Sequence, residues 1–278
     1  MITNAETITN KVSFDGDQNF RTFYSYDAGK LISPLAPTEA PEPVAEFVHD
    51  SFRALILNPR FTCVAAKSAF NKDNYRFSSY QHNLASPEAT ALLTRDLYLF
   101  VNDQQRMQEN GFFTFVATFT GPSGLNEAAF EGLLWSQLQE LHNNDASVSE
   151  WDATVSADPE SPHFEWSFGG QAFFVVGLHP ASSRFTRRFP FPTLVFNAHF
   201  QFEQLREAGK YERMQDVMRS RDTALQGTIN PNLADFGDSS DARQYSGRQV
   251  EGDWRCPFHA KAGSALDEPE TNERGDIL

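Results

Sequence analysis

The stretch HFEWSFGGQAFFVVGLHP, residues 163–180, predicts a β-hairpin and with it the fold class. Apolar and polar residues alternate over residues 163–168, which is typical of a strand with one buried face. A Gly-Gly pair then makes a turn, and residues 171–178 form an apolar second strand. Pro180 has no backbone N–H to donate to a neighbouring strand, so the second strand ends before it. The hairpin indicates an antiparallel sheet in the core.

Elements of mixed type lie on both sides of the hairpin. The spacing of apolar residues predicts helices over residues 44–56, 86–100, 127–141, 199–208 and 210–225, and strands over residues 61–66, 75–80, 112–119 and 193–196. The order contains no repeat and no regular alternation of strand, helix and strand. We therefore predict an α+β domain with a central, mostly antiparallel sheet flanked by helices.

Polar and proline-containing segments set the predicted domain boundaries. Residues 1–45 are expected to form an extended, partly mobile arm, because they are polar at first and then rich in proline. Residues 46–260 are expected to form one domain, since no long linker interrupts them. Residues 261–278 form an acidic tail with glycine and proline, which we expect to be disordered.

Composition and charge narrow the class of protein. The formal net charge of −14 argues against nucleic acid and anionic membranes as partners. A small cationic substrate, by contrast, would be attracted by the negative electrostatic field of the protein. No apolar run approaches the roughly 18 residues of a membrane-spanning helix, and the polar N-terminus lacks the order of a signal peptide. The two cysteines, Cys63 and Cys256, predict no disulfide framework. These features favour a cytoplasmic protein.

Two histidines of the central region could act as ligands or as acid–base groups. His179 ends an apolar strand before Pro180, where the chain must leave the sheet, and pockets often form at such exits. His199 begins a helix and shares an apolar face with Phe202 and Leu205, so each of its ring nitrogens needs a partner. A metal can provide one such partner. The commoner alternative for both residues is a histidine satisfied by ordinary hydrogen bonds.

A cluster of arginines lies between these histidines. Arg184, Arg187 and Arg188 stand out in an acidic chain and could bind an anion such as a carboxylate or a haem propionate. A solvated loop whose arginines pair with nearby carboxylates is the alternative. Residues 242–248 and 254–258 predict an ordered loop over the core or over a site. Within the second stretch, Cys256 is followed by proline and could be a haem thiolate or a buried thiol without chemical use.

Five stretches in a fixed order resemble the YqcI/YcgG family. They are SPHFEWSFGGQAFFVVGLHPASSR (161–184), RRFPFPTLVFNAHFQFEQLR (187–206), RDTALQGTINPNLADFG (221–237), ARQYSGR (242–248) and WRCPF (254–258). The resemblance implies a haem-dependent N-oxygenase, an oxidoreductase that hydroxylates a guanidine or amine nitrogen of a free amino acid such as arginine, or of a related small amine. It also implies haem b with histidine ligation, and O₂ with an external electron donor, or peroxide, as oxidant.

The roles that the resemblance implies have candidates among the residues of this chain. The resemblance does not choose among His163, His179 and His199 as the ligand of the haem iron; we expect His179, with His199 as the alternative. His163 and His199 are expected to act in catalysis. The expected partners of the haem propionates are Arg184, Arg187, Arg188 and Arg248. The carboxylates expected to bind a cationic amine or guanidinium are Asp158, Glu203 and Asp222, although ordinary loop or helix positions are the commoner reading of each.

Two other functions are compatible with the sequence. The protein could bind haem as a sensor or carrier without turnover, or it could be a metal-free binding domain. The sequence is also compatible with a homodimer. A visible absorption spectrum separates the haem hypotheses from the metal-free one.

Overall fold

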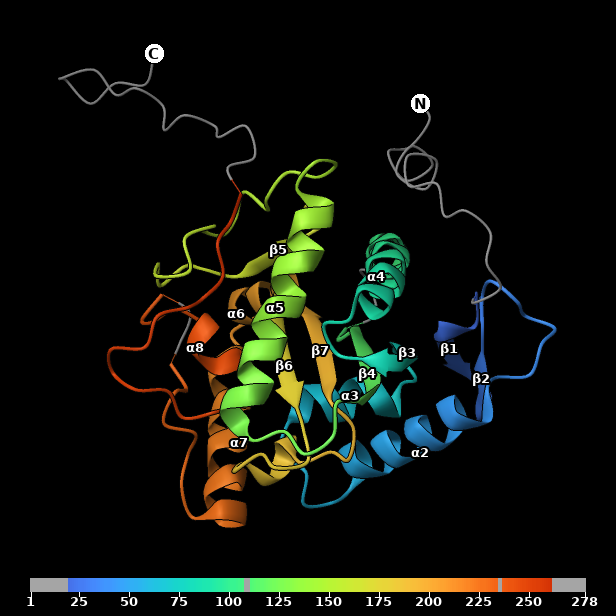
Figure 1. Cartoon of the computed structure of the whole chain (residues 1–278). Coiled ribbons are helices and arrows are strands. Elements are labelled where there is room, and N and C mark those ends of the chain that lie inside the picture. Colours follow the sequence, from blue (N-terminus) through green and yellow to red (C-terminus); the bar gives the residue numbers. More distant parts are fainter. Residues whose placement is uncertain (1–19, 108–110, 235–236, 262–278) are drawn as a thin grey trace.

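The computed structural model describes residues 20–107, 111–234 and 237–261, so residues 1–19 of the predicted arm and 262–278 of the predicted tail lie outside it. Its centre is a seven-stranded sheet in the order β2-β1-β3-β4-β7-β6-β5 (Figure 1). Strands β3 and β4 are parallel, and every other neighbouring pair is antiparallel. The α+β class and the mostly antiparallel sheet are therefore confirmed.

The strands are β1 (Phe23–Asp27), β2 (Lys30–Ile32), β3 (Tyr75–Asn83), β4 (Thr114–Gly121), β5 (Trp166–Phe168), β6 (Gln171–Leu178) and β7 (Thr193–Ala198). The helices are α2 (Pro43–Leu57), α3 (Val64–Asn71), α4 (Pro87–Met107), α5 (Glu127–Asp145), α6 (His199–Glu207), α7 (Tyr211–Gln226) and α8 (Ala242–Tyr245). Short 3-10 turns, η1 (Phe20–Thr22) and η2 (Phe185–Arg187), complete the described elements.

The predicted hairpin forms one edge of the sheet. Trp166 on β5 pairs with Phe173 on β6, and β6 pairs with β7 on its other side. Gly169 and Gly170 make the turn with φ angles of +63° and +74°, which glycine adopts without the clash of a Cβ. Strand β5 is shorter than the alternation predicted, because only residues 166–168 pair in the sheet.

Helices cover both faces of the sheet. Figure 1 shows α4 and α5 in front of the strands, and Leu97, Phe130 and Leu138 from these helices belong to the main core. Helices α2 and α3 contribute Phe52 and Phe70 to a second core on the opposite face. Because successive side chains of a strand point to opposite faces, the central strands β3, β4, β6 and β7 contribute to both cores.

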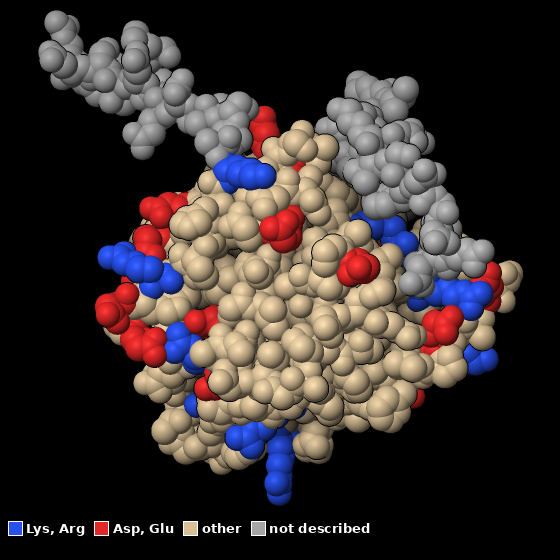
Figure 2. All heavy atoms as spheres, in the orientation of Figure 1, with Lys and Arg blue, Asp and Glu red and all other residues tan. Residues whose placement is uncertain are grey.

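The face formed by α4 and α5 carries no concentrated charge. In Figure 2 the acidic and basic side chains lie mainly around the edge of the molecule, and uncharged residues cover its middle. The net charge of −14 is therefore not gathered into an acidic patch on this face. Within the described part of the chain, no helix is long and apolar enough to cross a membrane.

The predicted strand over residues 61–66 is wrong. Residues 61–63 form a loop, and helix α3 begins at Val64. Cys63 is the N-cap of this helix, and its Sγ accepts a hydrogen bond of 3.5 Å from the backbone N–H of Ala66. A short apolar run does not distinguish a strand from a buried helix, and the alanines of this run favour the helix.

The predicted arm is wrong for residues 23–32. Strands β1 and β2 form a hairpin there, and β1 pairs with β3, so this segment extends the sheet. Phe23 and Tyr24 of β1 are 2% and 1% exposed, which means that the segment contributes to the core. Their apolar pattern is short and lies between polar and proline-rich segments. The burial becomes evident only from the partner strand, since β propensity depends on context.

Candidate functional site

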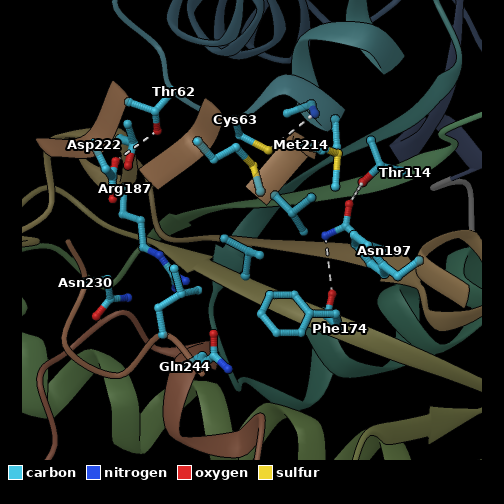
Figure 3. A pocket seen from close by; sticks show the side chains of 18 of the residues that line it. Thr62, Cys63, Thr114, Phe174, Arg187, Asn197, Met214, Asp222, Asn230 and Gln244 are labelled. Carbon is cyan, nitrogen blue, oxygen red and sulfur yellow. Dashed lines mark hydrogen bonds between the residues drawn. The ribbon is translucent and has the colours of Figure 1, made fainter. Parts of the chain in front are cut away.

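A cavity of about 280 Å³ lies on the α3 side of the sheet, which is the side opposite to α5. From β6 it is lined by Phe174, Val176 and Leu178, which alternate along the strand with residues that face α5. The other walls come from α2, α3 and the loop before it, β7, the η2 turn, α6, α7 and the segment around α8. In Figure 3 side chains from these elements converge on the cavity. Its volume is close to the lower end of the range for small-molecule sites.

The lining combines apolar walls with a polar rim. The apolar side chains include Phe52, Ile56, Phe61, Phe70, Phe174, Val176, Val195, Phe202, Met214 and Met218. The charged ones are Glu165, Arg184, Arg187, Arg206, Arg219, Asp222 and Asp241. A pocket with a few polar groups among apolar walls is typical of a site for a small organic ligand.

Two of the predicted residues, Arg184 and Asp222, form an ion pair in this pocket. Arg184 Nη2 lies 2.7 Å from Asp222 Oδ2, and the hydroxyl of Thr62 donates to Asp222 Oδ1 over 3.0 Å. The Arg184 guanidinium also donates to the backbone carbonyl of Thr228. Both charges are therefore neutralised within the protein.

Arg187, also predicted, lines the same pocket but forms no ion pair with any described carboxylate. Its Nη1 donates to the backbone carbonyl of Tyr245 over 2.8 Å and weakly to that of Gly177 over 3.4 Å. Burial, together with the positive charge of Arg184, lowers the pKa of Arg187 to about 10. The guanidinium stays charged at neutral pH, and its positive charge favours an anion beside it.

Gly247 of the ARQYSGR stretch makes room for Arg187. A Cβ at position 247 would lie 2.5 Å from Cδ of Arg187, and the backbone there has a φ of +80°. Both the short distance and the left-handed backbone require glycine. The conformation of this loop thus determines where the guanidinium of Arg187 lies.

His199 is held between two carboxylates. Its Nδ1 lies 3.0 Å from Glu165 Oε1, and its Nε2 lies 3.3 Å from Glu203 Oε1. Burial disfavours the charged imidazolium, but the hydrogen bond to Glu165 and the charges of both carboxylates outweigh it and raise the pKa of His199. Both ring nitrogens therefore have protein partners. Glu203 is about half exposed, is also paired with Arg206 and does not line the pocket.

Glu165 is the pocket residue with the least complete set of partners. It is 2% exposed and lines the pocket, and its Oε1 is bound to His199. Its Oε2 is buried and has no hydrogen-bond partner among the residues that the structure describes. A carboxylate oxygen in this state favours a cationic or hydrogen-bond-donating ligand.

His179 lies on the other face of the sheet. It is 0% exposed and stacks on Phe130 of α5, with ring centroids 4.5 Å apart. Neither ring nitrogen has a hydrogen-bond partner within the described ranges. Burial lowers the pKa of His179, so the neutral imidazole is favoured. His179 follows Leu178 of β6, which faces the pocket, and His179 itself is not part of the lining.

Four other predicted residues lie outside the pocket lining. His163 and Asp158 are exposed on the loop before β5. Arg188 is exposed, and its Nε donates to a backbone carbonyl over 2.6 Å. Arg248 forms an ion pair of 2.9 Å with Glu131 of α5. The structure therefore brings together Arg184, Arg187 and Asp222 of the predicted set and separates these four from them.

Glu165 and Cys63 are among the pocket residues that were not predicted to act in the site. Glu165 occupies a polar position in the alternation of the hairpin, which indicated a solvent-facing side chain. Cys63 occurs in the run that was read as a strand, yet its thiol lines the pocket near the base of α3 (Figure 3). Burial raises the pKa of Cys63. Cys256, the other cysteine, lies outside the lining, and burial raises its pKa to about 12.

Comparisons with known proteins give the family of this chain. The protein YcgG of Bacillus subtilis (strain 168), described as uncharacterized, is 29% identical over 210 residues, which cover 71% of this chain and 80% of YcgG. YqcI of the same organism, also described as uncharacterized, is 28% identical over 213 residues, with 72% and 80% coverage. No solved structure matches the chain. The model of the YqcI/YcgG family matches residues 52–259, well over half of the sequence, and the chain belongs to this family.

Proposed function

We propose that this protein is a haem-dependent N-oxygenase that hydroxylates a guanidine or amine nitrogen of a small cationic amino acid or a related amine. The observation that supports this proposal is the pocket on the α3 side of the sheet, with its apolar walls, its arginines and its buried carboxylate. O₂ with an external electron donor, or peroxide, would supply the oxygen atom.

The pocket lining is compatible with haem in three respects. Haem requires flat apolar walls, cations for two propionates and one axial donor. Phe52, Phe61 and Phe174 contribute apolar walls, and the lining holds Arg184, Arg187, Arg206 and Arg219. The described residues contain no group of three or more His, Cys, Asp or Glu side chains placed to hold a metal ion. Haem needs only one protein donor, so it does not depend on such a group.

Cys63 is the axial donor that this pocket favours. Among the described lining residues, Cys63, Met214, Met218 and Tyr211 carry side chains that can bind haem iron, and no histidine is among them. Burial raises the pKa of Cys63 and disfavours its thiolate, whereas binding to a metal deprotonates a thiol. His179 is the second candidate, because both of its ring nitrogens lack partners in the described structure.

Bound haem would supply oxygen activation, and the residues of the chain would bind and orient the substrate. The apolar walls exclude water from the reacting nitrogen, and the charged rim fixes the orientation of a polar ligand. An electron donor would have to come from another protein or a small reductant, since the chain carries no flavin or nicotinamide fingerprint.

The test is the absorption spectrum of the full-length protein, purified from cells supplied with a haem precursor. We expect a Soret band that Cys63→Ala abolishes and that Cys256→Ala, the matched control, leaves unchanged. Loss of the band in His179→Ala alone would move the ligand to the α5 face. Absence of the band, together with failure to bind added hemin, would overturn the proposal. A product of L-arginine that gains one oxygen atom in mass separates an enzyme from a haem sensor or carrier.

A further inference from the structure

One buried carboxylate of the pocket needs a partner that the described protein does not provide. Glu165 Oε1 is bound to His199, whereas Oε2 is buried and has no hydrogen-bond partner among the described residues. The residue is 2% exposed, so bulk water does not solvate this oxygen well. A positively charged nitrogen with several N–H donors is the complementary group.

Arg187, a cation of the same pocket, lacks an anionic partner. Arg187 donates to the backbone carbonyls of Tyr245 and Gly177, which are neutral, and no described carboxylate pairs with it. The other ion pairs near the pocket leave it no partner, because Asp222 binds Arg184 and Glu203 binds Arg206. A planar guanidinium in this state is complementary to a carboxylate.

Tyr245 binds Arg187 and the backbone of the residue after Glu165. Its backbone carbonyl accepts from Arg187, and its hydroxyl accepts from the backbone N–H of Trp166, the residue after Glu165. Tyr245 is 0% exposed, and its hydroxyl also donates to the carbonyl of Phe173 on β6. One buried residue therefore links the guanidinium of Arg187 to the backbone next to Glu165.

We infer that Glu165 and Arg187 form the two ends of a subsite for a free basic amino acid. The carboxylate of the ligand would bind Arg187, and its distal amine or guanidinium would bind Glu165 Oε2. The choice of a basic amino acid rests on the proposed function, but the subsite itself does not require haem. Arg187 then binds the substrate and not a haem propionate.

Isothermal titration of the full-length protein, with and without haem, tests the subsite. The probes are L-arginine, L-ornithine and agmatine, which is arginine without its carboxylate. We expect the wild type to bind L-arginine at least about 10-fold more tightly than agmatine. Arg187→Gln should weaken L-arginine about 10- to 100-fold and leave agmatine unchanged, whereas Glu165→Gln should weaken both.

Two matched variants separate the subsite from general effects of charge. Arg188→Gln removes the neighbouring exposed guanidinium, and Glu203→Gln removes the other carboxylate on His199. Both should bind L-arginine within about threefold of the wild type, since partly exposed charges contribute little. The preference of the wild type for L-arginine over agmatine provides a readout that does not depend on the folding of any variant.

Several results would overturn the inference. It fails if none of the three probes binds, if the wild type does not distinguish L-arginine from agmatine, or if Glu165→Gln and Arg187→Gln bind L-arginine as the wild type does. It also fails if Arg187→Gln loses haem but retains L-arginine, because Arg187 would then be a propionate partner. Binding of L-arginine that depends on both residues, in a protein that never binds haem, would support the subsite and refute only the proposed function.

Discussion

Replacing Gly247 by alanine should destabilise the protein and displace Arg187. The new Cβ would lie 2.5 Å from Cδ and 3.0 Å from Nε of Arg187, and a residue with a Cβ is strained at a φ of +80°. The left-handed backbone alone costs about 1–2 kcal/mol for a non-glycine residue. Moving Arg187 also removes the charged hydrogen bond to the carbonyl of Tyr245, worth about 1.5–3 kcal/mol. We expect a total loss of about 2.5–5 kcal/mol in the free energy of unfolding.

Gly227 offers a control with the same backbone strain. It ends α7 with a φ of +80°, and a Cβ there would meet no atom within 4 Å. Gly227→Ala should therefore show the backbone term of about 1–2 kcal/mol without the displacement of a side chain. The difference between the two variants isolates the contribution of the contact with Arg187.

Urea unfolding of both variants gives the two free energies, and titration with L-arginine gives the consequence for the pocket. Gly247→Ala should lose more stability than Gly227→Ala and should also bind L-arginine at least about 10-fold more weakly. Equal losses of stability in the two variants, with unchanged L-arginine affinity, would refute the view that Gly247 positions Arg187.

Three further predictions concern buried groups. His179→Leu should raise the free energy of unfolding by about 1 kcal/mol in calorimetry or urea titration, because the buried ring nitrogens of His179 have no described partners. A loss of stability would show instead that a ligand or an internal water binds the ring. Asp96→Asn should cost about 3–5 kcal/mol by the same measurement, since Asp96 is 0% exposed, binds Arg95 and accepts from three hydroxyls, and an unchanged midpoint would contradict this. The ion pairs of His199 should stabilise the fold below about pH 6.5 and lose this contribution as the pH rises through the raised pKa of His199. The stability difference between wild type and His199→Gln should therefore shrink as the pH rises above about 6.5.

The hairpin shows what the sequence pattern can predict about the fold. Alternation, a glycine pair and a terminating proline are local signals, and they specify a turn and two strands without reference to the rest of the chain. The hairpin of residues 23–32 lacks such a signal, because its burial is created by β3. Helix α3 is a second case, since an apolar run of alanines and valine is compatible with either element until Cys63 caps it.

The site was only partly predictable for a related reason. Arg187 stood out because an arginine cluster is unusual in an acidic chain, and it does line the pocket. Glu165 was passed over, since a polar residue in an alternating strand indicates solvent rather than a buried cavity. The alternation of polar and apolar residues distinguishes the two faces of a strand. It does not show which of these faces borders the cavity. That depends on α6 and α7, which follow β7 in sequence and provide the remaining walls.

This distinction between faces also connects the two open questions about ligands. The groups with missing partners lie on opposite sides of β6, with Glu165 lining the pocket and His179 stacked against α5. A ligand in the pocket can bind Glu165 and Arg187 but does not contact His179, which lies on the opposite face of the sheet. His179→Leu should therefore leave the affinity for L-arginine unchanged. If the same variant instead removes the Soret band, haem binds on the α5 face, and the pocket is left to the substrate alone.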